Sequence, residues 1–282
     1  MTEPRVPLPR LPSHRMSAPT TDDARTALTS LTGEDVDALW AEVCAEAGVP
    51  EGAYLLDLDQ MTALADAVAA RPGAVGLAGR ALAIRVATYR ALSTHETTAL
   101  PTDWARRSME SLLRGRVPDT ARMAEILDLD LFSDAARARL DRAARRVAER
   151  FGAPIGLVSI VLEGSQQFAG SHGLEGWLAE VGGTPLEWSF CATSVRTREA
   201  YIVPDAHSDV IQRTNPLVDQ DGVRTYAGVP LVTSRGQVLG NYCLIGSEAR
   251  SWTAEETAEL QAMADALVAE LERTRVSGRT TV

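Results

Sequence analysis

The chain has 282 residues, a formal net charge of −10 and a hydrophobic fraction of 45%. This length suffices for two modest domains with buried cores. Every basic residue is arginine, which excludes lysine-based covalent catalysis and a phosphate-loop lysine. The acidic balance argues against nucleic acid and anionic membranes as partners, and no apolar run reaches the roughly 20 residues of a membrane-spanning helix.

The three cysteines, Cys44, Cys191 and Cys243, are far apart and form no CxxC or Cys/His cluster. This spacing argues against a disulfide framework and a metal site, and it suits a reducing cytoplasm. Residues 1–21 are rich in proline and contain no apolar stretch, so they are not a secretory signal. We expect a cytoplasmic protein with disordered tails at 1–21 and 274–282.

Residues 22–132 are expected to form an all-α helical domain, because their apolar residues recur with a helical period. The third helix is apolar almost all round, which predicts burial between other helices. We expect five helices in this region. The first carries Val36 to Val43 and ends at Gly48, and the others span 59–70, 76–92, 102–113 and 118–127.

Residues 133–273 form a second expected domain, in which helices enclose β-strands. An amphipathic helix runs from Ser133 to Phe151, and a last helix begins at Thr253 with Glu256 in the capping-box position. Between them, hairpin signals predict a mainly antiparallel sheet, hence an α+β fold. The expected strands are 155–161, 166–171, 200–203, 223–233 and 237–245, with a short helix at 188–195. Gly240 and Ala227-Gly228 indicate close backbone approach, and Pro230 indicates an edge or bulge.

Four local segments carry a family resemblance. They are Ser189 to Cys191, Ala200 to Ala206, Arg224 to Leu231 and Val238 to Ile245. In order and spacing they resemble the GAF domains of bacterial sensory proteins, over about half of the chain. The resemblance implies a small-molecule pocket and a regulatory role. The N-terminal half resembles no family that we can name.

The candidate ligand-binding residues are the aromatic, polar and sulfur-bearing side chains nearest the expected pocket. They are Phe168, Trp188, Phe190, Cys191, Asp205, Arg224, Tyr226 and Cys243. Core packing is the competing interpretation of the aromatic rings, and surface solvation that of Asp205 and Arg224. We expect no catalytic residue and no metal ligand, and the residues identify no cofactor. Whether either Cys191 or Cys243 is redox-active stays open.

We therefore expect a signal-sensing protein that binds an unidentified small molecule, relays its state to a partner and is not an enzyme. The chain ends within ten residues of the last expected helix. Output is thus expected through the N-terminal helices or a separate signalling protein. Apolar stripes on both flanking helices predict a homodimer. Two alternatives are a thiol-dependent reductase, similar to GAF-type methionine sulfoxide reductases, and a ligand-free interaction scaffold.

Overall fold

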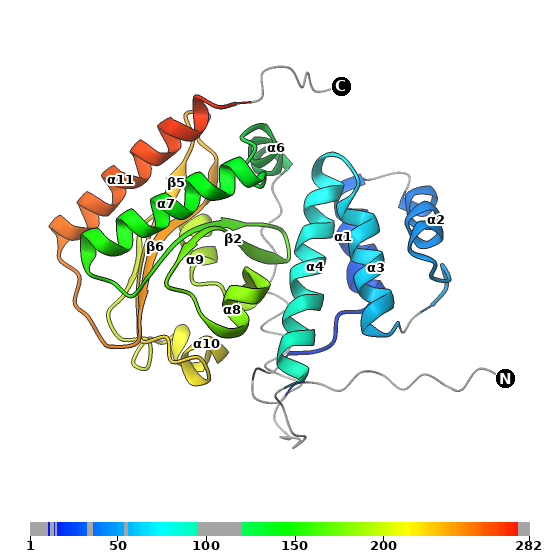
Figure 1. Cartoon of the computed structure of the whole chain (residues 1–282), viewed down its shortest axis with the longest axis horizontal. Coiled ribbons are helices and arrows are strands. Elements are labelled where there is room, and N and C mark those ends of the chain that lie inside the picture. Colours follow the sequence, from blue (N-terminus) through cyan, green and yellow to red (C-terminus); the bar gives the residue numbers. More distant parts are fainter. Residues whose placement is uncertain are drawn as a thin grey trace.

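The computed structural model describes residues 11, 14, 16–32, 36–53, 56–94 and 120–275. A helical part lies beside a sheet that carries helices on both faces (Figure 1). The expected helix at 102–113 lies outside the described residues, as do residues 1–10 and 276–282 of the two expected tails. Within the described residues, no helix is long and apolar enough to cross a membrane.

The helical part has its own core, in which Trp40, Met61 and Leu64 are buried. Asp57 caps α3 by accepting a hydrogen bond from Gln60 N, and Gln60 reciprocates in a capping box. The helices before the sheet are α1 (Thr21–Thr32), α2 (Val36–Ala47), α3 (Leu58–Ala69), α4 (Gly73–Ser93) and α6 (Thr120–Asp128). Of these, α1 was not predicted.

Helix α4 is apolar almost all round because it contributes side chains to three hydrophobic clusters at once. Its side chains enter the helical core, the core beneath α7 and the cluster on the opposite sheet face. Leu82 and Val86 lie in the helical core, and Leu77 and Ala81 lie in the core beneath α7. Tyr89 and Leu92 lie in the cluster on the opposite face. The sequence predicted burial between helices; the structure adds contact with the sheet edge, because α4 also packs against β3.

The sheet has six strands in the order β3-β2-β1-β6-β5-β4, and every neighbouring pair is antiparallel. This confirms the expected mainly antiparallel sheet flanked by helices, preceded by a helical region. The strands are β1 (Ile155–Val161), β2 (Ser165–His172), β3 (Gly183–Pro185), β4 (Tyr201–Val203), β5 (Thr225–Val232) and β6 (Val238–Gly246).

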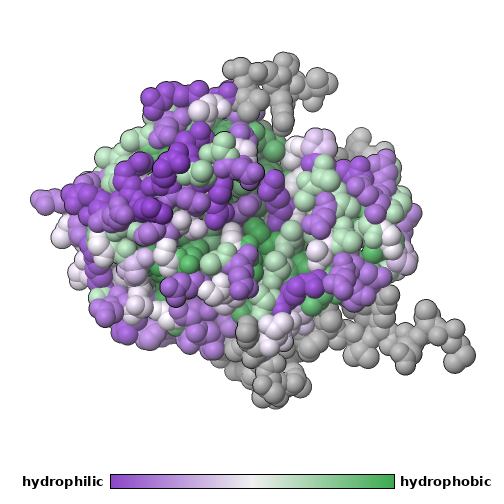
Figure 2. All heavy atoms as spheres, in the orientation of Figure 1, coloured by the Kyte–Doolittle hydropathy of each residue, from purple (hydrophilic) through white to green (hydrophobic). Residues whose placement is uncertain are grey.

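Helices α7 (Asp134–Phe151) and α11 (Ala254–Glu272) cover one face of this sheet. Ser133 caps α7, and Thr253 forms the predicted capping box with Glu256. The apolar stripes of both helices are buried against the chain's own sheet. Figure 2 shows a strongly hydrophilic outer surface along α7. The expected homodimer stays a prediction and needs surface other than these stripes.

The opposite face, which we call the inner face, is covered by short elements. They are α8 (Gly176–Val181), η1 (Leu186–Trp188), α9 (Cys191–Thr197), η2 (Gln212–Thr214) and α10 (Pro216–Asp219). Two backbone features beneath them match the sequence. A Cβ on Gly240 would lie 1.9 Å from Ser159 O, so only glycine fits there. The ladder shifts register between Pro230 and Val232, which places the proline at a bulge.

The N-terminal segment reaches the inner face. Leu11 and Met16 exchange backbone hydrogen bonds of 2.8 and 3.1 Å, and both side chains are buried in the inner-face cluster. These positions differ from the expected disordered tail over 1–21, and Thr21 begins α1. The reason is that the two apolar side chains gain a buried site on a surface that the sequence could not reveal.

Candidate functional site

The inner face brings four of the predicted ligand-binding residues together. The rings of Phe190 and Tyr226 lie 5.1 Å apart between centroids. The Sγ atoms of Cys191 and Cys243 lie 3.9 Å apart. All four side chains are buried, because Cys191 begins α9 directly over the strands that carry Tyr226 and Cys243.

Tyr226 is fixed by a hydrogen-bonded network. Its hydroxyl donates to Cys191 Sγ at 3.3 Å, and its phenol folds over Gly228, where a Cβ would lie 2.0 Å from the hydroxyl oxygen. With its amide oriented to satisfy its neighbours, Asn241 donates to Cys191 O at 3.1 Å and accepts from Ser194 Oγ at 2.8 Å. These contacts make the ring part of an ordered polar cluster inside the protein.

Neither Tyr226 nor Cys243 ionises near neutral pH. Burial raises the pKa of the Tyr226 phenol well above its ordinary value. The hydrogen bond with Cys191, together with burial, raises the pKa of the Cys243 thiol well above its ordinary value. Tyr226 therefore serves as a neutral hydrogen-bonding group rather than as a base.

The remaining predicted residues fall into two groups. Phe168 and Trp188 are buried in the same inner-face cluster. Asp205 and Arg224 instead bind each other, with Arg224 Nε 2.5 Å from Asp205 Oδ1 and Nη2 3.0 Å from Oδ2. The hydrogen bonds from Arg224 lower the pKa of Asp205 to about 2. This ion pair joins the end of β4 to the start of β5.

A buried polar chain on the inner face escaped sequence reasoning. Gln166 accepts from Ser159 Oγ at 3.2 Å, donates to Thr184 Oγ1 at 2.9 Å and also binds the Ser189 hydroxyl. All four residues are buried. The available signal was Ser159, a polar residue between Val158 and Ile160 in an otherwise apolar strand. Buried polar groups of this kind can recognise a ligand or specify the packing.

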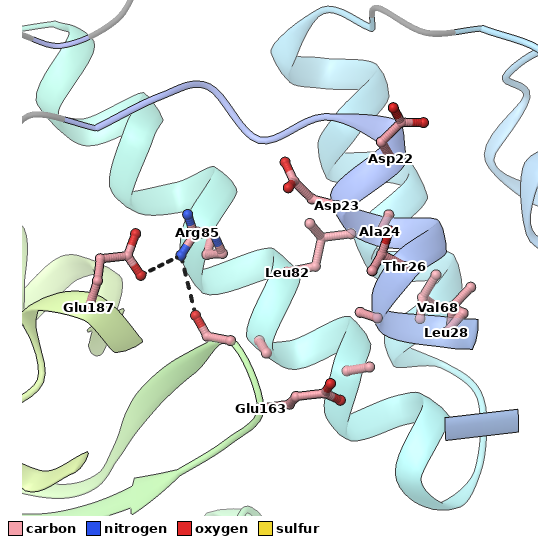
Figure 3. Close-up of a pocket in the computed structure, with 14 residues that line it drawn as sticks. Asp22, Asp23, Ala24, Thr26, Leu28, Val68, Leu82, Arg85, Glu163 and Glu187 are labelled. Atoms are coloured by element: carbon pink, nitrogen blue, oxygen red, sulfur yellow. Dashed lines mark hydrogen bonds and ion pairs between the residues drawn. The ribbon is translucent and has the colours of Figure 1, made fainter. Parts of the chain in front are cut away.

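A second feature is a cavity of about 390 Å³ between the helical part and the turn that joins β1 to β2 (Figure 3). Its apolar wall comes from α1, α3 and α4, and includes Leu28, Val68 and Leu82. Carboxylates of Asp22, Asp23, Glu163 and Glu187 also line it. None of the predicted site residues does.

Arg85 bridges the two parts at this cavity. Its Nη1 donates to Glu187 Oε2 at 2.8 Å and to Gly164 O at 3.3 Å. Burial opposes the charge of Arg85, but the Glu187 carboxylate outweighs it, so the pKa of Arg85 is raised. Glu163 on the turn accepts from Ser30 Oγ of α1 at 2.8 Å. Polar contacts therefore tie α1 and α4 to the sheet domain.

Within the described ranges, no group of three or more His, Cys, Asp or Glu side chains is placed to hold a metal ion.

Comparison with known proteins places the C-terminal half in a family. The sequence pattern of the GAF domain matches residues 136–271. A cyclic di-GMP phosphodiesterase of Pseudomonas aeruginosa is 34% identical over 136 residues, which cover 48% of this chain and 22% of the relative. The chain thus spans well under half the length of that curated relative.

Solved structures with similar regions include a GAF domain from a phosphoenolpyruvate-protein phosphotransferase of Coxiella burnetii. It has a TM-score of 0.43 and 18% identity, with 51% of this chain and 86% of that chain covered. Another is a type II free methionine-R-sulfoxide reductase from Thermoplasma acidophilum. It has a TM-score of 0.42 and 14% identity, and the match covers 51% of this chain and 96% of that chain.

The expectation that the chain is not an enzyme is overturned by this comparison, because the Pseudomonas relative is named as a phosphodiesterase. That expectation rested on the absence of lysine and of a CxxC or Cys/His cluster, which excludes only the kinds of chemistry that need those residues. The family resemblance is confirmed: residues 136–271 of this chain are a GAF domain.

Proposed function

We propose that the protein is a signal-sensing regulator whose GAF domain binds a small molecule and relays the bound state to a partner. The observation that carries this proposal is the cavity between the helical part and the β1–β2 turn. Its two walls belong to different parts of the chain, so a ligand that fills it contacts both. Such a ligand shifts the balance between arrangements of the two parts by its differential affinity for them.

The lining favours a small ligand of mixed polarity. The cavity volume of about 390 Å³ falls in the range of ordinary small-molecule sites, roughly 300–1,000 Å³. Leu28 and Leu82 offer apolar contact, while Arg85 and Glu163 offer oriented charges. A ligand that displaces Glu187 from Arg85 would loosen the link between α4 and the sheet domain.

The inner face is proposed as a second place for a ligand, beside Phe190 and Tyr226. Phe168, Trp188, Cys191 and Cys243 would complete its wall, with Asp205 and Arg224 at its edge. In the present arrangement these side chains pack against one another. A ligand there must therefore separate them.

A thermal-shift screen of nucleotides, amino acids and small aromatic compounds tests the proposal. A ligand at a hundredfold excess over Kd adds about 2.7 kcal/mol of stability to the folded state. Ala27 lines the cavity and is half-buried, so Ala27→Trp should fill the cavity and remove the shift. Ala38 is exposed on α2, and Ala38→Trp is the matched control that should keep it. If the thermal shift persists in Ala27→Trp, the ligand does not bind in the cavity. If no class of compound shifts the melting temperature, the interaction scaffold is favoured.

The name of the Pseudomonas relative favours a second candidate function, a role in cyclic di-GMP turnover. The test is to incubate the full chain with cyclic di-GMP, separate the products by chromatography and measure binding by calorimetry. Hydrolysis in proportion to protein would support a catalytic role, and binding without hydrolysis would support a regulatory one. If the chain neither hydrolyses nor binds cyclic di-GMP, this second candidate function is refuted.

A further inference from the structure

Two tryptophans and a carboxylate form a three-sided box at the edge of the inner face. Trp177 of α8 and Trp188 of η1 are nearly perpendicular, with ring centroids 6.3 Å apart and an interplanar angle of 87°. Asp221, in the loop between α10 and β5, accepts a 2.7 Å hydrogen bond from Trp177 Nε1. Its side chain is only 16% exposed. We call these three side chains the cage.

The chain's own His14 occupies this cage. Its ring centroid lies 5.7 Å from that of Trp188 and 6.0 Å from that of Trp177. His14 Nε2 lies 3.4 Å from Asp221 Oδ2, and the residue is 8% exposed. Leu11 and Met16 flank it in sequence and are buried in the same cluster. The N-terminal segment thus holds an imidazole against two indole rings and a carboxylate.

The cage has the chemistry of an organic-cation site. Indole faces attract a cation within about 6 Å of the ring centroid, and desolvation strengthens that attraction. Asp221 supplies a formal negative charge in the same place. Its Oδ2 atom is buried and accepts no hydrogen bond from the residues that the structure describes. A cation beside this oxygen would compensate its buried negative charge, and the two indole rings favour a cation with an apolar surface, such as a quaternary ammonium group.

We propose that Trp177, Trp188 and Asp221 form a binding site for a small organic cation, and that His14 is its intramolecular occupant. A quaternary or methylated ammonium compound would then compete with the N-terminal segment for the cage. Because Leu11 and Met16 are buried beside the inner-face residues, displacement of His14 also uncovers that face. The proposal is independent of the cavity beside α1 and goes beyond the sensing role proposed above.

Titration of the full chain with choline tests the cage, with tryptophan fluorescence and calorimetry as readouts. The matched neutral probe is 3,3-dimethylbutan-1-ol, which has the shape of choline without its charge. His14→Ala should raise the affinity for choline about tenfold or more, because the cage is then vacant in every molecule. His207 is exposed and outside the cage, so His207→Ala is the control that should bind choline like the wild type.

Removal of the Asp221 charge should reverse the increase in choline affinity that His14→Ala produces. In the His14→Ala background, Asp221→Asn should weaken choline binding about tenfold, and Trp177→Leu provides a second variant if the first does not fold. Equal affinity for choline and the neutral alcohol would overturn the cation site. Unchanged choline affinity in His14→Ala would show that His14 is not the occupant, and no choline binding in a folded His14→Ala protein would refute the cage itself.

Discussion

The ion pair between Arg85 and Glu187 predicts strong thermodynamic coupling between the helical part and the GAF domain. The two side chains are 23% and 17% exposed and meet at 2.8 Å. Removing one partner of a fully buried pair costs about 3–5 kcal/mol, because the other charge is left without compensation. Since both ends retain some contact with water, we expect Arg85→Met to cost about 2–3 kcal/mol. We expect a coupling energy of about 1–2 kcal/mol in a double-mutant cycle with Glu187→Met.

Urea denaturation followed by circular dichroism measures each corner of this cycle. The matched control is the pair of Arg90 and Asp59, which has a similar distance of 2.9 Å but exposed side chains at 45% and 89%. Its coupling energy should stay at or below about 0.5 kcal/mol. If the Arg85–Glu187 coupling is no larger than that of the control, the pair is not a structural link and the reasoning from its burial is wrong.

Three further predictions concern the sheet domain. Gly240→Ala should lower stability by about 2–3 kcal/mol, because the added methyl group collides with the neighbouring strand. A methyl group at Gly164 meets open space, so Gly164→Ala should change stability by less than about 0.5 kcal/mol, and thermal melting of both variants makes the comparison. Tyr226→Phe removes a buried hydrogen-bonding hydroxyl and should cost about 1–2 kcal/mol in urea denaturation. Asp205 has a lowered pKa of about 2, so the stability that its pair with Arg224 contributes should be complete above about pH 4 and lost as the pH falls through about 2. A stability difference between wild type and Asp205→Asn that persists below that pH would contradict the assignment.

The elements with clear periodicity and caps were predictable from sequence. The strand at Ile155–Val161 and the capping box at Thr253 agree with the structure residue for residue. Helix α1 was missed because its buried apolar side chains, among the described residues, are those of Ala24 and Leu28, so its apolar stripe is weak. The three-residue strand β3 was missed because only its pairing with β2 defines it. Weak local signals of this kind depend on tertiary contacts.

The candidate site was predictable only where residues of neighbouring strands face the same side of the sheet. Tyr226 and Cys243 lie on inner-facing positions of neighbouring strands, and the family resemblance added Phe190 and Cys191 nearby. The cavity beside α1 could not be foreseen, because its walls come from segments far apart in the chain. The cage could not be foreseen either, since Trp177 and Asp221 meet only through the fold.

The triple role of α4 has a consequence for how the chain folds. Because this one helix supplies side chains to all three hydrophobic clusters, none of them can be completed without it. Unfolding of α4 itself would therefore disrupt every cluster together, and we expect the helical part and the GAF domain to unfold as one cooperative unit. In hydrogen-exchange experiments the central amides of α4 should be among the last to exchange, and they should do so at the same rate as those of β1.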